Sequence, residues 1–366
     1  MINKLVIENL RHRPVRTLLS VVAIGVEVTM ILTLVGLCRG MLDESQRRAR
    51  GAGADIWVRP PGSSVISLSS APMPEKILTF FQQQPHVVLA TGTMSQVLRG
   101  VESITGIDID AFERMSGGLR FLSGGRFANQ FDVVVDERYA TQHKLRVGDT
   151  IRLLGKPWRV CGIVEPGKLA RVMVRLPLLQ ELTSNTGKVS QILLKVDRKE
   201  NVDKVVDTLK AHPQLEGYGI YSIEEFTSMF SVGNVPGLSE FIGVVIALSV
   251  IVGFLVVFLS MYTAVLERTR EVGILKSLGA TPGFVLSMLV RETALLALTG
   301  TALGIVLTYG TRWLVSFLVP ASLTQKIVSD WWPIAAAIAI GGAMLGSLYP
   351  GWKAVRQDAL EALSYE

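Results

Sequence analysis

The sequence contains few of the residues that build metal and redox centres. Among its 366 residues are two cysteines, Cys38 and Cys161, and four histidines that are scattered along the chain. Neither cysteine has a Cys-x-x-Cys neighbour, so the sequence predicts no metal site and no redox motif. A disulfide between Cys38 and Cys161 requires that both face an oxidising compartment, and it stays an open alternative.

Charged residues are scarce for a water-soluble protein. They make up 19% of the chain, whereas 49% is hydrophobic, and soluble domains typically carry about 25% charged residues. We therefore expect part of the chain to lie in lipid. The net charge of +6 is compatible with nucleic-acid binding, but the Lys and Arg residues gather beside apolar runs, which is typical of membrane topology. We expect no nucleic-acid partner.

Catalytic motifs are missing as well. A P-loop requires Gly-x-x-x-x-Gly-Lys followed by Ser or Thr, because its backbone amides cradle phosphates. The Gly-Lys pairs at Lys156, Lys168 and Lys188 are followed by other residues. The sequence also lacks a Gly-x-Ser-x-Gly elbow, a His-Glu-x-x-His helix and a convincing pair of carboxylates. We predict that this chain is not an enzyme, has no catalytic residue and binds no cofactor.

What the sequence does contain is a set of four long apolar runs. About 20 apolar residues cross the ~30 Å hydrocarbon core of a bilayer. Arg291 and Glu292 near the start of the third run place its crossing at residues 293–315. The predicted transmembrane helices are residues 17–40, 241–263, 284–319 and 331–349.

Basic residues indicate the orientation of these helices. We predict an amphipathic helix on the membrane surface at residues 1–16; a signal peptide is the competing interpretation, but the following run is too long and lacks a cleavage site. Residues 1–16, 264–283 and 350–366 are rich in Lys and Arg, whereas the loop before the fourth run offers only Lys326. The positive-inside rule therefore predicts cytoplasmic termini.

Residues 41–236 form the predicted outer domain. Residues 39–53 are polar and basic, and we predict that they continue the first membrane helix as a stalk. From Ala54 the chain changes to short β-type runs separated by Gly and Pro. They predict a folded α+β domain of roughly 170 residues, inserted between the first two membrane helices and lying outside the cytoplasm. A capping box at Ser222 and Glu225 begins its last helix. The predicted strands are residues 54–59, 97–109, 133–136, 150–154, 158–164, 172–175, 191–196 and 219–221, and the predicted helices are residues 74–84, 137–143, 176–184 and 202–211.

Small residues four apart occur in every predicted span. Such pairs let two helices approach closely. Packing within one subunit and packing between two subunits both explain them, but four helices are few to enclose a path, so we expect a homodimer. The pairs are Gly36 and Gly40, Ser249 and Gly253, Gly300 and Gly304, and Gly342 and Gly346.

Two acidic residues fall within or beside the spans. Glu27 lies near the middle of the first span and Glu292 near the start of the third. A carboxylate in lipid costs several kcal/mol unless it is neutral or paired. Glu27 either faces a dimer interface or a translocation path, or is protonated and bonded to a neighbouring helix. An intramembrane enzyme with Glu27 as its acid is a further alternative, although no second catalytic group lies at comparable depth.

The stretch ERTREVGILKSLGATP, between the second and third runs, is too ordered in pattern for a plain loop. It predicts a helix of about four turns with opposite charges three residues apart, ended by Gly279 and Pro282. Its apolar stripe either docks into a groove on another protein or lies on lipid, and both interpretations stay open.

The same stretch, followed by Arg291-Glu292 and Gly300-x-x-x-Gly304, closely resembles the C-terminal region of FtsX/MacB-type ABC transporter permeases. This is the type VII or mechanotransmission family, with DevC-, LolC- and MacB-type members. The opening RHRPVRTLLSVVAIGV and the ending YPGWKAVRQDALEALSYE are similar to those of the family. One span, a large outer domain and three further spans match its layout.

The resemblance implies a permease dimer in the bacterial cytoplasmic (inner) membrane, paired with a cytoplasmic ABC ATPase that binds ATP and Mg. It also implies a MacB-like outer domain with an inserted lobe at about residues 101–188, and a possible periplasmic adaptor. Residues 264–283 would be the coupling helix that docks on the ATPase. Its candidate contact residues are Glu267, Arg268, Arg270, Glu271, Val272, Gly273, Leu275, Lys276 and Gly279.

Two functions follow from this resemblance. The first is export or extraction of an amphiphilic substrate, such as a lipid, lipoprotein, peptide or drug, driven by movement of the outer domains. The alternative is an FtsX-like regulator that transports nothing and activates a cell-wall hydrolase outside the membrane. The large predicted outer domain favours the first, because such regulators tend to carry smaller outer domains.

Overall fold

The structure, a computed structural model, describes residues 8, 11–63, 71–99, 102–269, 273–274, 277, 279–318 and 323–356. The chain divides into two compact units. The helical unit comprises residues 1–38, 237–318 and 325–366, and the sheet unit comprises residues 39–236 and 319–324. The predicted segments at residues 1–16 and 350–366 lie partly outside the described residues.

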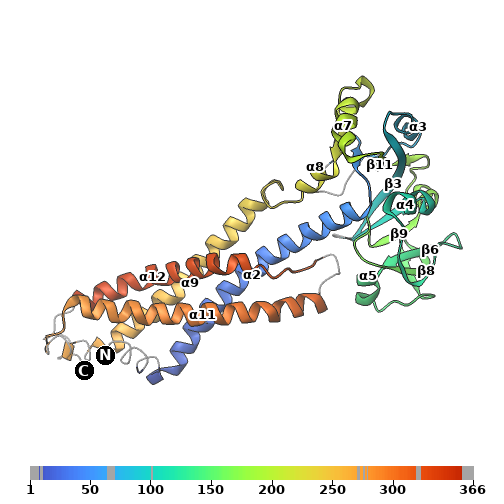
Figure 1. Ribbon diagram of the computed structural model, residues 1–366. Coiled ribbons are helices and arrows are strands. Elements are labelled where there is room, and N and C mark those ends of the chain that lie inside the picture. Colours follow the sequence, from blue (N-terminus) through green and yellow to red (C-terminus); the bar gives the residue numbers. More distant parts are fainter. Residues whose placement is uncertain are drawn as a thin grey trace. The chain divides into compact units, whose positions relative to one another are not determined.

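Long helices dominate the helical unit (Figure 1). Within the described part of the chain, four helices are long and apolar enough to cross a membrane. The predicted fold class, four membrane helices with an α/β domain between the first and second, is confirmed. The helices are α2 (Pro14–Gly51), α9 (Leu238–Glu267), α11 (Pro282–Leu318) and α12 (Trp332–Arg356), the last preceded by the 3-10 helix η3 (Ser329–Trp331).

All four helices reach beyond their predicted spans, and α2 and α12 reach the furthest. α2 has 38 residues and is therefore about 57 Å long at 1.5 Å per residue. Its residues 39–51 lie in the sheet unit. They continue the helix, in agreement with the predicted stalk, because the Glu, Gln and Arg that follow the apolar run are good helix formers. α12 contains Pro350 and continues to Arg356, beyond the predicted span end at residue 349.

α9 shows how the helical unit divides its surface. Ser249, Gly253, Val257 and Met261 follow one another at intervals of four and are buried, so they form one stripe along the helix. Phe241 and other large apolar side chains of α9 are about half exposed, which is typical of a surface that faces lipid. Figure 1 shows α12 lying beside both α9 and α11.

The sheet unit is built on a ten-stranded sheet in the order β12-β1-β11-β3-β4-β9-β6-β8-β5, with β7 also paired to β8. Pairing is antiparallel except between β4 and β9 and between β6 and β8. The strands are β1 (Ile56–Arg59), β3 (Val87–Arg99), β4 (Glu102–Ile107), β5 (Phe121–Gly124), β6 (Asp132–Asp136), β7 (Thr150–Leu153), β8 (Lys156–Val164), β9 (Val172–Arg175), β11 (Gln191–Val196) and β12 (Gly219–Ser222), and a separate pair is formed by β2 (Met73–Pro74) and β10 (Lys188–Val189).

Helices and buried side chains cover both faces of this sheet. Alternate residues of β1 enter two different cores: Ile56 and Val58 join the larger cluster, and Trp57 joins the other. Trp158 is fully buried and donates its Nε1–H to the Leu153 carbonyl at 2.9 Å. The helices are α3 (Ile77–Gln82), α4 (Ile109–Ser116), α5 (Glu137–Gln142), α6 (Leu176–Leu182), α7 (Val202–Lys210) and α8 (Ile223–Ser228), with 3-10 helices η1 (Lys199–Asn201) and η2 (Pro213–Leu215).

Most predicted elements of this domain are confirmed, and two predictions are wrong. Pro74 lies in the short strand β2 rather than at the start of a helix. The predicted strand at residues 97–109 is the antiparallel hairpin of β3 and β4, followed by α4. The start of α4 is fixed by Asp108, whose carboxylate accepts from the backbone N–H groups of Asp110 and Ala111.

Both cysteines are free thiols, Cys38 in the helical unit and Cys161 in the sheet unit. Burial, with Asp132 nearby, raises the pKa of Cys161 to about 12. Its thiol therefore stays protonated at neutral pH and is not a reactive nucleophile.

Candidate functional site

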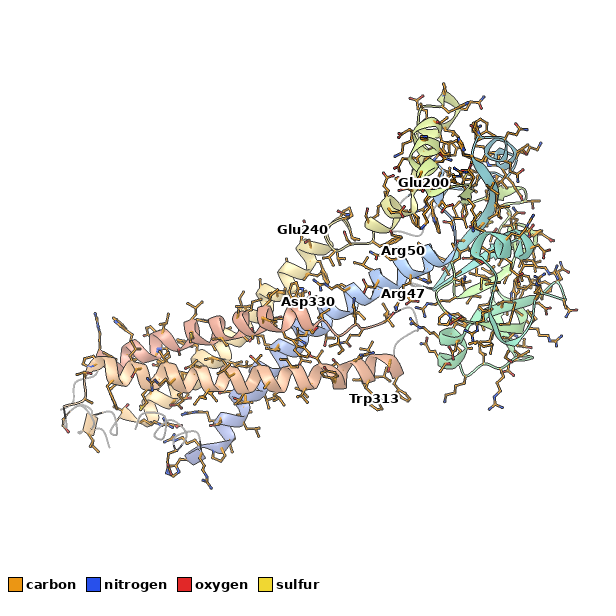
Figure 2. The ribbon with its side chains drawn as sticks, in the orientation of Figure 1. Arg47, Arg50, Glu200, Glu240, Trp313 and Asp330 are labelled. Carbon is orange, nitrogen blue, oxygen red and sulfur yellow. The ribbon has the colours of Figure 1, made fainter. Side chains whose placement is uncertain are left out.

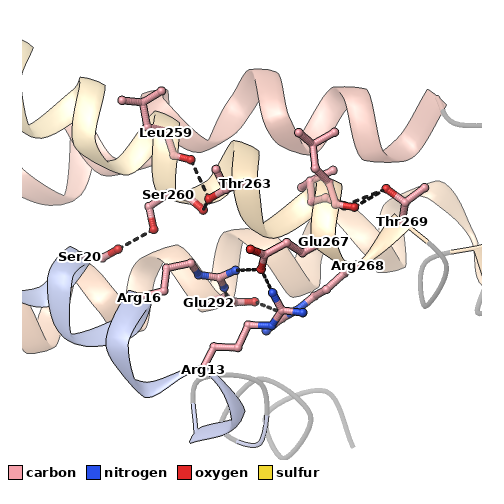
Figure 3. Close-up of polar contacts among 12 residues, drawn as sticks. Arg13, Arg16, Ser20, Leu259, Ser260, Thr263, Glu267, Arg268, Thr269 and Glu292 are labelled. Atoms are coloured by element: carbon pink, nitrogen blue, oxygen red, sulfur yellow. Dashed lines mark hydrogen bonds and ion pairs between the residues drawn. The ribbon is translucent and has the colours of Figure 1, made fainter. Parts of the chain in front are cut away.

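A cluster of five charged residues joins three helices at one end of the helical unit (Figure 3). Arg13 precedes α2 and Arg16 lies in its first turn, Glu267 ends α9, Arg268 follows it, and Glu292 belongs to α11. We call this group the Glu292 cluster. It brings together residues up to 279 positions apart in the sequence, so it ties the helices to one another rather than stabilising one of them.

Glu292 is the centre of this cluster. Its side chain has no exposed surface, and its two oxygens accept from different arginines. Arg16 Nη2 donates to Oε1 at 3.3 Å, and Arg268 Nη1 donates to Oε2 at 3.2 Å. The Arg16 and Arg268 side chains are 17% and 7% exposed. A buried carboxylate is tolerated when both oxygens are paired in this way.

Glu267 is the second carboxylate of the cluster and is more exposed than Glu292. It forms an ion pair with Arg13 and lies 3.8 Å from Arg16 Nη1. Arg16 therefore lies between two carboxylates, one on α9 and one on α11. Figure 3 shows Ser20 of α2 beside Ser260 of α9, and the two hydroxyl oxygens are 2.6 Å apart. Movement of the end of α9 would consequently act directly on α2.

The predicted coupling segment is only partly described. Glu267 ends α9 and Arg268 caps it, so the two residues belong to the Glu292 cluster and not to the face of a separate helix. Gly273 is helical, and Gly279 has a φ of 93°, a left-handed conformation that favours glycine. The other candidate contact residues, Arg270, Glu271, Val272, Leu275 and Lys276, lie outside the described residues.

Gly300 and Gly304 of α11 lie against α2. A Cβ atom on Gly300 would come within 2.7 Å of the Ile24 Cβ, and one on Gly304 within 2.7 Å of the Gly25 carbonyl oxygen. Thr29 Oγ1 donates to the Gly304 carbonyl at 3.1 Å. These contacts lie within one chain and leave no space for a side chain at either glycine.

The two glycines of the predicted pair in α12, Gly342 and Gly346, differ in how closely they are packed. A Cβ on Gly346 of α12 would lie 2.9 Å from the Phe254 carbonyl oxygen of α9, whereas one on Gly342 would meet nothing closer than Val250 at 3.6 Å. Gly346 therefore has no room for a side chain, whereas Gly342 has room for a methyl group. Gly36 has a similar role in α2, where its carbonyl accepts from the Lys326 backbone N–H at 3.0 Å.

Glu27 lies inside the helical unit. Its side chain is 6% exposed and occupies the space that a Cβ on Gly253 of α9 would need. Glu27 Oε1 has no hydrogen-bond partner among the described residues. The glycine therefore makes room for a carboxyl group on the neighbouring helix, which the sequence did not reveal because the two residues are 226 positions apart.

A second buried carboxylate lies in the sheet unit, on the last part of α2. Glu44 is 2% exposed and accepts from Arg47 Nη2 at 2.6 Å and from Arg138 Nη1 at 2.7 Å, with Arg171 Nη2 at 3.7 Å. We call these four residues the Glu44 cluster. Burial, followed by the proximity of Arg48, lowers the pKa of Arg171. The cluster fixes α2 to α5 and to Arg171, the residue directly before β9.

Apart from Arg268, sequence reasoning missed the basic residues of both clusters. Arg13 and Arg16 were assigned to the membrane surface, and Arg138 and Arg171 were not singled out. Arg16 carried a usable signal, because it directly precedes an apolar run and lies on the side of the membrane predicted for Arg268 and Glu292. The partners of Glu44 carried none, since only the fold brings them together.

Family models match both parts of this chain. The model of the FtsX-like permease C-terminal domain matches residues 243–359, and the model of the MacB-like periplasmic core domain matches residues 17–212, more than half of the chain. The boundaries of the two matches differ from those of the two compact units, because the second begins within α2.

Individual relatives are similar over large parts of the chain. An uncharacterised ABC transporter permease, YknZ of Bacillus subtilis (strain 168), is 28% identical over 263 residues, which is 67% of this chain and 63% of the relative. The macrolide export ATP-binding/permease protein MacB of Escherichia coli is 24% identical over 391 residues, 97% of this chain and 59% of the relative. The chain thus spans about three fifths of the length of these curated relatives.

Solved structures include the periplasmic region of MacB from Actinobacillus actinomycetemcomitans. It is 17% identical, covers 51% of this chain and 97% of that chain, and has a TM-score of 0.38. The extracellular domain of the ABC-type transporter YknZ from Gram-positive bacteria is 14% identical and covers 46% of this chain and 100% of that chain, with a TM-score of 0.35.

Proposed function

The chain belongs to the family of ABC transporter permeases that combine a MacB-like periplasmic core domain with an FtsX-like C-terminal domain, and we propose that it couples ATP hydrolysis in a separate cytoplasmic ATPase to movement of its sheet unit. This movement exports or extracts an amphiphilic substrate such as a lipid, lipoprotein, peptide or drug. ATP and Mg bind to the ATPase and not to this chain.

The observation that carries the proposal is the construction of α2. It is one uninterrupted helix with a buried ion cluster near each end. Arg16, in its first turn, pairs with Glu292 of α11, and Glu44, in its second half, pairs with Arg138 of α5. A helix held in this way transmits displacement along its axis, because its hydrogen bonds resist stretching and the carboxylate at each attachment is buried.

The input to this device is the segment after α9. Arg268 follows α9 directly and contacts Glu292, so a force applied to residues 269–281 reaches α2 through one buried carboxylate. We place this segment and both termini in the cytoplasm, the protein in the bacterial cytoplasmic membrane, and two copies of it in the assembly. A periplasmic adaptor is a further partner in this proposal.

Association with the ATPase tests the coupling role of the segment. Val272→Asp and Leu275→Asp are each introduced into the full chain, which is then co-purified with the ABC ATPases of the same organism. We expect the amount of bound ATPase to fall sharply, because each change places a charge on the apolar stripe of the predicted docking face. Leu122→Asp is the control, since Leu122 is an exposed residue of β5 in the sheet unit. Unchanged association of both variants would overturn the coupling role.

The transported molecule is tested separately. The full assembly is trapped with an ATPase partner that binds ATP without hydrolysing it, and the molecules that co-purify with the permease are identified by mass spectrometry. Recovery of a lipid, lipoprotein, peptide or drug supports transport. Recovery of a cell-wall hydrolase without such a ligand would instead show a regulator.

A further inference from the structure

The sheet unit contains a cavity that neither ion cluster uses. It lies on one face of the strands β1, β11, β3 and β4 and is closed by residues of α2 and α8. Its volume is about 110 Å³. Drug-sized ligands occupy pockets of roughly 300–1,000 Å³, so this cavity suits a group of only a few heavy atoms.

The floor of the cavity is polar, which is unusual for a covered sheet face. Ser95 pairs with Thr105 in the antiparallel register of β3 and β4, and Val97 pairs with Ser103. The Ser95 and Thr105 hydroxyl oxygens are 3.1 Å apart, so this contact uses only one of their two protons. The other hydroxyl proton, together with that of Ser103, is available to an acceptor inside the cavity.

Two buried side-chain N–H groups of β1 belong to residues that line the same cavity, and neither has a hydrogen-bond acceptor among the described residues. Arg59 is 6% exposed and Trp57 is 4% exposed. Arg59 Nε and Trp57 Nε1 lack hydrogen-bond partners among the described residues. A buried donor without an acceptor costs roughly 1–3 kcal/mol, so two of them in one cavity indicate that an acceptor belongs there.

The charged side chains that line the cavity are positive. Arg48 and Arg59 line the cavity, and none of the other described residues that line it is acidic. The described part of the chain contains no ion pair for Arg59. Burial lowers the pKa of Arg59, with the Tyr221 hydroxyl acting in the opposite direction, as expected for a cation that lacks a counter-charge.

An apolar wall completes the cavity. Phe226 and Phe230 line it, and Phe226 stacks on Trp57 with the ring centroids 4.4 Å apart. We propose that this cavity binds a small oxyanion, a phosphate or carboxylate group, with Arg59 and Trp57 as donors and the aromatic side chains against any apolar part of the molecule. The ligand is either a free anion or the headgroup of an anionic lipid.

Binding to the full chain in a neutral detergent tests this site. Inorganic phosphate and dihexanoyl phosphatidic acid are titrated separately in a calorimeter against the wild type and against Arg59→Gln. We expect Arg59→Gln to weaken binding by about tenfold or more, because a charge-assisted hydrogen bond to the anion is lost. Trp57→Phe keeps the ring stack but removes the N–H, and we expect a smaller loss. Arg159→Gln is the matched control, since Arg159 is an exposed arginine of β8.

The two titrations distinguish the sources of the ligand. Tighter binding of phosphatidic acid than of phosphate, dependent on Arg59, assigns the site to a lipid headgroup, and similar binding of both assigns it to a free anion. Thermal unfolding shows whether Arg59→Gln is folded, and Trp57→Phe with Ser103→Ala replaces it if it is not. The proposal is overturned if neither probe binds the wild type at millimolar concentration, or if the cavity variants bind as tightly as Arg159→Gln.

Discussion

The Glu292 cluster and the Glu44 cluster both hold a buried carboxylate, but they differ in how far their arginines are exposed to water. Each places a carboxylate with almost no exposed surface between arginines from distant parts of the sequence. Around Glu292 both arginines are nearly buried, whereas around Glu44 the Arg47 and Arg138 side chains are 59% and 35% exposed. The first cluster is a closed joint among helices, and the second is open to water on one side.

This difference predicts unequal strength. An ion pair whose partners are both buried cannot be replaced by hydration when one partner is removed. Arginines that already contact water lose little when their carboxylate disappears. We therefore expect α2 to be held more firmly where it meets α9 and α11 than where it meets α5 and Arg171. In the proposed function, the first is the rigid end of α2 and the second is its more yielding end.

Removal of Glu292 has the largest expected effect. Glu292→Ala leaves Arg16 and Arg268 buried without their shared carboxylate, and we expect a loss of about 3–5 kcal/mol in the free energy of unfolding. Denaturant unfolding of the purified chain in detergent measures it. Glu240→Ala is the control, since Glu240 is an exposed residue of α9 (Figure 2), and we expect a loss below about 1 kcal/mol. Equal stability of both variants would contradict the closed joint.

Glu44→Ala provides the direct comparison. We expect a loss of about 1–3 kcal/mol, because only Arg171 stays buried without the carboxylate, while Arg47 and Arg138 can turn to water. The exposed Glu200 of η1 (Figure 2) supplies the control variant Glu200→Ala. The same unfolding measurement serves both clusters. A larger loss for Glu44→Ala than for Glu292→Ala would reverse the assignment of the rigid and yielding ends.

The sequence predicted the two clusters unequally. Glu292 stood out because a carboxylate beside an apolar run needs a partner. Arg268 was named as a contact residue for the ATPase, and that docking role stays a prediction. Glu44 lies in a polar segment rich in arginine, and the sequence analysis did not single it out. Arg138 and Arg171 reach it only because β6 and β9 are paired in the sheet, and a long-range pairing of this kind has no local signal.

The fold was easier to predict than these contacts. Runs of about 20 apolar residues define membrane helices by length alone, and strands such as β6 and β11 are continuous apolar runs between turns. The pairing of β3 with β4 was missed because the sequence has β-type residues both before Arg99 and after Glu102, so the two strands were taken as one. The pairing of Glu27 with Gly253 was also inaccessible, since the requirement for a missing side chain appears only when two helices are in contact.

Glu27 is a third buried carboxyl group to compare with Glu292 and Glu44, and it forms no ion pair with any of the described residues. Gly253→Ala places a methyl group where the Glu27 side chain lies, and we expect a loss of about 1–3 kcal/mol from overpacking. Gly342→Ala is the matched control in α12, because its Cβ would meet Val250 at 3.6 Å, an ordinary contact. Thermal unfolding in detergent compares the two variants.

A second substitution identifies the cause. Glu27→Ala in the Gly253→Ala background removes the side chain that collides with the new methyl group, so the double variant should be more stable than additive losses predict. Strictly additive losses would show that Gly253 is constrained by another neighbour. Glu27→Gln alone should keep the contact, because the amide has nearly the same size as the carboxyl group.

The smallest effect is expected at a carboxylate on the surface of the sheet unit. Asp197 accepts from Asn201 Nδ2 at 2.9 Å and contacts His86 Nδ1 at 3.0 Å, and these bonds lower its pKa to about 2. Because the pKa in the folded state lies below the value of about 3.9 in an unfolded chain, the carboxylate stabilises the fold above that value. The contribution is lost as the pH falls towards 2. Asp197→Asn should therefore unfold at a lower temperature than the wild type at neutral pH, and the gap should close in acid. A gap that does not change with pH would mean that the hydrogen bonds, and not the charge, stabilise this turn.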